Sequence, residues 1–276
     1  MLFSGSPWTG ALGPAGRVAG WIVAAGAIVL ACSSPEPVKA APTPSPAFLG
    51  GTQRVVLEVD YAPGAAPYVG DVPLLFPDVW VLSQSNLERL LPGKTVTIPH
   101  KIEEMEALDD PGTTEFTADA VLALAKTHRG QKTEGAVASF YAVWLRGYYK
   151  DDKGVVHDDV LGISIGDTGV LALFKPVIQS GALPGVSATS RILEQATLIH
   201  ELGHTLGLVN NGISMVTPHQ DVKHGAHCTN PKCIMYWENE GRAYASNFVK
   251  DYVKTGNDVL FGPECLADTD RAGGKK

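Results

Sequence analysis

Short segments in which apolar and polar residues alternate fill the first two thirds of the chain, and this period of two predicts half-buried strands. Residues 53–61 show it clearly, with Val55, Leu57 and Val59 on one face. Further strands are predicted over residues 94–99, 138–149, 161–166 and 170–174. The strand over 161–166 has a face of small residues, which either packs closely or lets another backbone lie alongside.

Apolar residues spaced three or four positions apart predict helices in three other segments. These segments are residues 82–91, 114–128 and 191–206, and Ser190 is the predicted N-cap of the last one. Strands and helices alternate up to residue 175, and helix dominates afterwards. The pattern therefore predicts an α+β or α/β domain with a mixed sheet and a long helix near its end.

The first fifty residues differ from this pattern. Residues 18–31 are an unbroken apolar and small-residue stretch, which suits an export signal and is short for a membrane span. The stretch ends in Leu30-Ala31-Cys32, which resembles a bacterial lipobox and implies a signal peptide over 1–31 and a lipid on Cys32. An ordinary membrane anchor, or secretion after cleavage elsewhere, is the alternative. Prolines keep the next segment extended, so residues 32–50 are predicted to be a tether.

The folded domain is predicted over residues 51–268, which is long enough for one sizeable core, and a polar tail over 269–276 follows it. The formal net charge is −7, and the longest basic cluster is the terminal Lys275-Lys276. A chain of this charge is not expected to bind nucleic acid. The expected protein is a monomer held in the cell envelope, at the outer membrane, by the lipid on Cys32.

The helix predicted over 191–206 carries an H-E-x-x-H motif. His200 and His204 are one turn apart, so both imidazoles can approach one ion to about 2.0–2.1 Å. Glu201 lies between them in sequence, where it can take a proton from a metal-bound water. The motif also arises by chance in unrelated helices, but Gly207 predicts a sharp reversal of the chain soon after it.

Downstream of the reversal, the residues continue a known pattern. The stretch from His200 to Gly207 resembles the metzincin zinc peptidases, and His227-Cys228-x4-Cys233-x-Met235 resembles the matching block of archaemetzincins. The resemblance implies a metzincin-like fold, with a mixed twisted sheet, an active-site helix and a smaller, irregular C-terminal lobe. It also implies zinc bound by His200, His204 and His227, with Glu201 as general base and Met235 in a methionine turn that supports the site.

Two features depart from that family. The usual position of the third ligand is Asn210, a weak zinc ligand, and the inserted segment 211–226 adds His219 and His224 as alternatives to His227. The C-x-x-C pair that archaemetzincins use for a second zinc ion is missing, and only Cys265 follows. We therefore expect a single catalytic zinc ion, no second site of four cysteines, and a Cys228–Cys233 disulfide that leaves Cys265 over.

These features predict a zinc-dependent peptidase that acts on peptide or protein substrates through a zinc-activated water. The strand over 161–166, or the one after it, is the candidate edge beside which a substrate would lie as an added strand. The alternative enzyme is a gluzincin with Glu240 as third ligand. The alternatives without catalysis are a metal-binding surface lipoprotein, and a structural zinc ion bound by both Cys228 and Cys233.

Overall fold

The computed structural model describes residues 45–72, 76–181, 187–240, 254–255 and 258–274, all within a unit that spans residues 41–276. The predicted signal peptide, Cys32 and most of the predicted tether lie outside the described residues, so the lipid anchor stays a prediction. Within the described part of the chain, no helix is both long and apolar enough to cross a bilayer.

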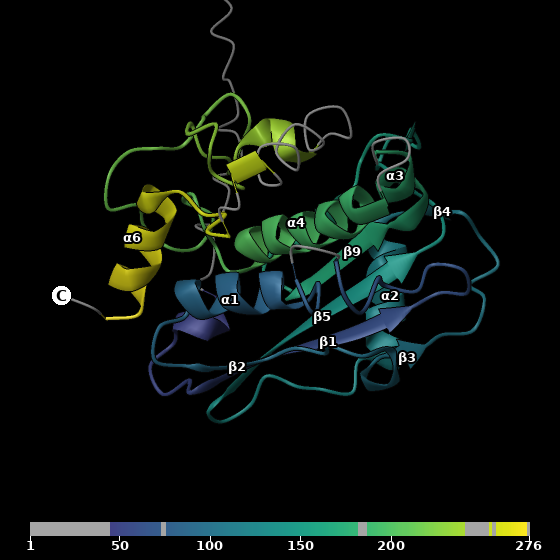
Figure 1. Ribbon diagram of the computed structural model, residues 1–276, viewed down its shortest axis with the longest axis horizontal. Helices are drawn as coiled ribbons and strands as arrows, with labels where there is room; N and C mark the ends of the chain where they lie inside the picture. Colours follow the sequence, from purple (N-terminus) through teal and green to yellow (C-terminus); the bar gives the residue numbers. More distant parts are fainter. Residues whose placement is uncertain (1–44, 73–75, 182–186, 241–253, 256–257, 275–276) are drawn as a thin grey trace, which may run out of the picture. The chain divides into compact units, whose positions relative to one another are not determined.

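A mixed sheet lies at the centre of the fold (Figure 1). Its strands follow the order β2-β1-β5-β9-β8, and β3 also pairs with β1. The pairs are parallel except that of β8 with β9. The bounds are β1 Arg54–Tyr61, β2 Thr95–Thr97, β3 Glu106–Ala107, β5 Val137–Leu145, β8 Gly162–Ser164 and β9 Val170–Phe174. A smaller sheet contains β4 (Glu115–Phe116), β6 (Tyr148–Lys150) and β7 (Val156–His157) in that order.

The strand β5 is the core of the main sheet, because every residue from Ala138 to Leu145 is buried. Burial of successive residues means that both faces of the sheet are covered, as is usual for parallel strands. Helix α4 (Ser187–Thr205) runs along the sheet and packs on β8 and β9, with α1 (Val81–Leu90) beside it (Figure 1). Helix α2 (Ala118–His128) packs on β5 and β9. The α+β class with a mixed twisted sheet is thus confirmed.

Some predicted elements begin or end elsewhere in the structure. The helix predicted from residue 114 begins only at Ala118, because the Thr117 side chain caps it by accepting a hydrogen bond from Ala120 N at 3.2 Å. The strand predicted over 138–149 is two strands, β5 and β6. They separate at Gly147, which lies so close to the Thr114 carbonyl that no side chain would fit.

The folded domain is longer than predicted at both ends. A short 3-10 helix, η1 (Pro46–Phe48), buries Ala47 inside the predicted tether. At the other end, α6 (Pro263–Ala272) continues past the predicted boundary at residue 268 and buries Asp268 and Thr269. The remaining short helices are η2 (Ile102–Glu104), α3 (Lys175–Ser180) and η3 (Trp237–Glu240).

A buried ion pair fixes the first half of α4. Lys175 Nζ, at the start of α3, lies 2.5 Å from Glu194 Oε2, and both side chains are almost fully buried. Burial lowers the pKa of Lys175 and raises the pKa of Glu194. Glu194 also accepts a hydrogen bond of 2.6 Å from Tyr68 N, so the pair connects α3, α4 and the loop after β1. The helix begins at Ser187, three residues before the predicted cap at Ser190.

Candidate metal centre

The end of α4 turns the chain back on itself. Gly207 has a φ of 86°, and its N–H donates to the His204 carbonyl at 2.9 Å. Glycine adopts this left-handed conformation without the penalty of a Cβ, which explains its place after the helix. Val209 (φ 54°) and Asn210 (φ 61°) are also left-handed, and such backbone costs on the order of 1–3 kcal/mol for a residue like valine. The reversal is therefore a strongly determined local structure.

The structure brings His200 and His204 together with His227, from the segment after the reversal. The Nε2 atom of His204 lies 3.1 Å from that of His200 and 3.2 Å from that of His227. Three imidazoles that ligate one zinc ion tetrahedrally place their nitrogens about 3.3 Å apart, given Zn–N distances of about 2.0–2.1 Å. All three histidines are buried. The donor set and its spacing thus fit a zinc ion.

The backbone orients two of these rings. His200 Nδ1 lies 2.7 Å from the carbonyl of Ile234, and His227 Nδ1 lies 2.5 Å from the carbonyl of His224. An N–H that donates to a carbonyl must be on Nδ1, which leaves the lone pair on Nε2, facing the centre of the group. Sequence patterns do not reveal these two carbonyls, because the contacts depend on where the later segment folds.

Met235 lies directly beneath α4. It is fully buried, and a Cβ at Gly203 would overlap its sulfur, so only glycine at 203 lets the methionine pack this closely. The backbone around Met235 also holds the group, since Met235 O accepts from Cys228 N at 2.7 Å, next to His227. Met235 therefore packs against α4 at Gly203 and pairs with the backbone next to His227.

Glu201 is buried and lines a cleft of about 420 Å³ together with His204. The other wall of the cleft includes Gly162 and Ser164 of β8, the last strand in the order of the sheet. A Cβ at Gly162 would lie 3.0 Å from Glu201 Cγ. The small-residue face of this strand thus has a packing reason at Gly162, and the rest of the strand borders the cleft.

The two alternative histidines lie elsewhere. His224 is partly exposed, its Nδ1 lies 2.7 Å from Asp221 Oδ2, and its ring stacks on Trp237 at 4.0 Å between centroids. His219 is buried, but its Nε2 faces the cysteines rather than the other histidines. Asn210 is exposed, and its amide donates to Gln220 Oε1 at 3.3 Å. Glu240 ends η3, and its side chain lies outside the described residues.

The cysteines differ from the prediction. Cys228, Cys233 and Cys265 are all free and buried, so the expected Cys228–Cys233 disulfide is not formed. The prediction was wrong because it left out α6, which brings Cys265 to 3.6 Å from Cys233, measured between sulfurs. Hydrogen bonds from the other two thiols lower the pKa of Cys228 to about 3. Cys228, Cys233 and Cys265 thus form one group of buried thiols, and Cys265 does not stand apart from the other two.

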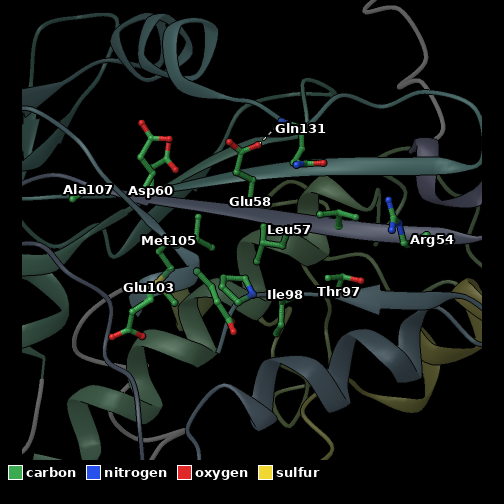
Figure 2. A pocket seen from close by; sticks show the side chains of 15 residues that line it. Arg54, Leu57, Glu58, Asp60, Thr97, Ile98, Glu103, Met105, Ala107 and Gln131 are labelled. Carbon is green, nitrogen blue, oxygen red and sulfur yellow. Dashed lines mark hydrogen bonds between the residues drawn. The ribbon is translucent and has the colours of Figure 1, made fainter. Parts of the chain in front are cut away.

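A larger pocket of about 840 Å³ lies along the edge of β1, between β2 and β3 (Figure 2). Glu58 and Asp60 project to the same side of the strand there. Burial raises the pKa of Asp60 to about 6, and its Oδ2 accepts a hydrogen bond of 2.6 Å from Tyr141. None of the predicted site residues lines this pocket. The pocket is thus separate from the histidine group.

Comparison with known proteins adds little to these observations. No known family model matches the chain, and no curated protein matches it. The chain is similar to the crystal structure of a zinc-dependent peptidase from Methanocorpusculum labreanum, with a TM-score of 0.42 and 16% identity over 78% of this chain and 99% of that chain. A likeness of this degree assigns no function to this chain.

Proposed function

We propose that this protein is a zinc-dependent peptidase. The observation that carries the proposal is the convergence of His200, His204 and His227 beside Glu201, at the edge of an open cleft. Three protein ligands leave one coordination position for water or substrate, which is the arrangement of catalytic rather than structural zinc sites. When bound there, zinc supplies a Lewis acid that activates water near neutral pH and polarises a carbonyl.

Glu201 is the proposed general base. Its carboxylate accepts a proton from the attacking water and later gives that proton to the leaving amine nitrogen. Its position on α4, one residue after His200, fixes the carboxylate close to the ligands but at the cleft wall. The Glu201 side chain is buried and lies against Gly162 of β8, where an added Cβ would come within 3.0 Å of Glu201 Cγ.

A peptide substrate would lie beside β8. The strand is at the end of the sheet order, so one of its sides can accept a further strand. Ile163 and Tyr149 line the same cleft and offer apolar contacts to substrate side chains. The turn at Met235 and the third histidine after Gly207 support placing the protein among the metzincins, with the archaemetzincins as the most similar group.

The two alternative hypotheses, a gluzincin-type peptidase and a metal-binding protein without catalysis, have less support. A gluzincin needs a glutamate as third ligand, whereas His227 already occupies the third corner of this group. A protein that only stores or captures metal has no use for a carboxylate at residue 201.

Removal and return of the metal tests the proposed function. The purified full chain should hydrolyse a library of fluorogenic peptides, lose this activity in a strong chelator and regain it when zinc is added. The His204→Ala variant is the matched control, because it should stay inactive after the same zinc addition. Peptide hydrolysis that persists in chelator, with the protein shown to be free of zinc, would refute the proposal.

A further inference from the structure

The pocket along β1 is bordered mainly by carboxylates. In the described part of the chain, Arg54 is the one basic residue in its lining, against five acidic residues, which are Glu58, Asp60, Glu103, Glu104 and Glu106. The lining therefore has a formal charge of −4. A concave surface that carries charge of one sign raises the local concentration of ligands of the opposite sign. The pocket thus favours a positively charged ligand.

Backbone N–H groups already satisfy two of these carboxylates. Glu58 accepts hydrogen bonds from Gly130 N at 2.8 Å and from Gln131 N at 2.7 Å. Glu104 Oε2 accepts a hydrogen bond of 2.8 Å from His100 N. Both carboxylates therefore have structural partners, and the charge that is available to a ligand comes from the others.

Asp60 is the buried carboxylate of the pocket. The residue is only 1% exposed, and its side chain projects from β1 to the same side as that of Glu58 (Figure 2). Its Oδ2 accepts the hydrogen bond from Tyr141, whereas its Oδ1 has no hydrogen-bond partner among the described residues. A buried carboxylate oxygen without a partner is costly, and a bound cation would remove that cost.

Glu106 lies next to Asp60 on the neighbouring strand. The register pairs Asp60 of β1 with Glu106 of β3, so both side chains project from the same face of the sheet. Burial and the nearby charge of Glu106 raise the pKa of Asp60, because both disfavour a second negative charge there. The Glu106 side chain is 59% exposed, and its Oε1 is 3.8 Å from His128 Nδ1. Glu106 is thus accessible to a ligand, and a cation between the two carboxylates would relieve their repulsion.

Part of the edge of β1 in this pocket has no neighbouring strand. Strand β2 pairs with β1 at residues 54–56 and β3 pairs with it at residues 60–61, so neither covers residues 57–59 on that side. These three residues line the pocket, and none of them forms an isolated bridge with another described residue. An extended peptide can hydrogen-bond to a strand edge of this kind.

Apolar side chains contribute to the lining of the pocket. Ile98 and Met105 come from the segment that connects β2 to β3, and both are buried. Lysine and arginine have long aliphatic stems that pack on apolar surface while the charged end reaches polar groups. The combination of buried apolar residues and carboxylates therefore suits a basic side chain of a peptide.

The size and spacing of the pocket favour an organic cation over a metal ion. Its volume of about 840 Å³ lies within the range of sites for organic ligands. The groups of described residues whose ligand atoms cluster closely enough for a metal ion lie elsewhere, at the histidines and the cysteines. A guanidinium group needs no such cluster, because its planar donors bind carboxylates two at a time.

We propose that this pocket binds a short basic segment of a partner protein, whose arginine side chain pairs with Asp60 and Glu106. The segment lies in extended form along residues 57–59 of β1, and the stem of its arginine packs on Met105. The proposal does not depend on the peptidase activity, because the residues of this pocket and those of the cleft beside Glu201 do not overlap.

Binding of two matched peptides to the full chain tests this proposal. The probe is an acetylated and amidated pentapeptide that carries a fluorophore and has arginine at its centre, between valine and threonine residues. The control peptide has citrulline in place of arginine, which keeps the shape and removes the charge. The chain carries Glu201→Gln so that the probe stays intact. The arginine peptide should bind at least about 10-fold more tightly, as expected for hydrogen bonds between charged groups.

Variants of the pocket locate the binding site. Asp60→Asn and Glu106→Gln should each weaken binding of the arginine peptide about 10-fold or more. Glu88→Gln is the matched control, since Glu88 is an exposed carboxylate on α1 outside the pocket, and it should bind like the parent. The Glu106 variant keeps the test decisive if Asp60→Asn fails to fold, because the Glu106 side chain is exposed.

Three results would overturn the proposal. The first is equal binding, or no binding at millimolar concentration, of the two peptides. The second is an affinity for the arginine peptide that Glu106→Gln and a folded Asp60→Asn both leave unchanged. The third is loss of binding in a chain that carries His204→Ala, which would place the peptide in the cleft of the histidine group. Peptide hydrolysis is measured separately, so failure of the peptidase function leaves this test intact.

Discussion

Replacement of Glu201 by glutamine should lower the rate of peptide hydrolysis about 10²- to 10⁴-fold, the usual contribution of a general base. Glutamine has nearly the same size as glutamate, so at position 201 of α4 it should pack against Gly162 as glutamate does, without disturbing the histidines. Zinc content should stay that of the parent, because Glu201 is not among the clustered ligand atoms. Hydrolysis rates and zinc content are measured on the same preparation.

Glu103→Gln is a suitable control for this substitution. Glu103 is exposed on η2 and lines the separate pocket along β1, so its replacement should leave the rate unchanged. Two results would count against the proposed role of Glu201. One is a glutamine variant that works at the parental rate, and the other is a variant that loses its zinc together with its activity.

Replacement of His227 by alanine should weaken zinc binding at the catalytic group by more than about 100-fold. Loss of a residue that merely supports a ligand already costs 10- to 100-fold in affinity, and His227 is proposed to be a ligand itself. Two histidines on α4 would remain, which is fewer than the three protein ligands of catalytic zinc sites. Competition with a chelator of known affinity measures the change.

His224→Ala is the matched control, three residues earlier in the same segment. Its ring is partly exposed and stacks on Trp237, and its backbone carbonyl, which the substitution keeps, contacts His227. The control should bind zinc like the parent. If the His224 variant loses the catalytic ion while the His227 variant retains it, the third ligand must be reassigned.

The sequence was sufficient where local periodicity determines the structure. The helical period places His200 and His204 on one face, and the alternation in residues 53–61 predicts β1 almost to the residue. The contacts that select His227 over His219 and His224 join segments that are distant in sequence. Examples are the pairing of Cys228 N with Met235 O and of His200 Nδ1 with Ile234 O. Such contacts leave no periodic trace in the sequence.

The cysteine group was missed for a related reason. Helix α6 buries Cys265, Asp268 and Thr269, so its inward face is polar and small rather than apolar. A search for apolar periodicity therefore does not detect this helix, and Cys265 then looks isolated. The useful signal was the number of cysteines after Cys32, because three cysteines can form one group in which none is left over.

The most direct test of the central claim is an anomalous difference map, recorded at the zinc absorption edge from crystals of the zinc-loaded full chain. We expect a peak about 2.0–2.1 Å from the Nε2 atoms of His200, His204 and His227, with Glu201 beside it and outside direct coordination. Crystals that contain zinc but show no peak among these three histidines would contradict the assignment of this group as the catalytic metal centre.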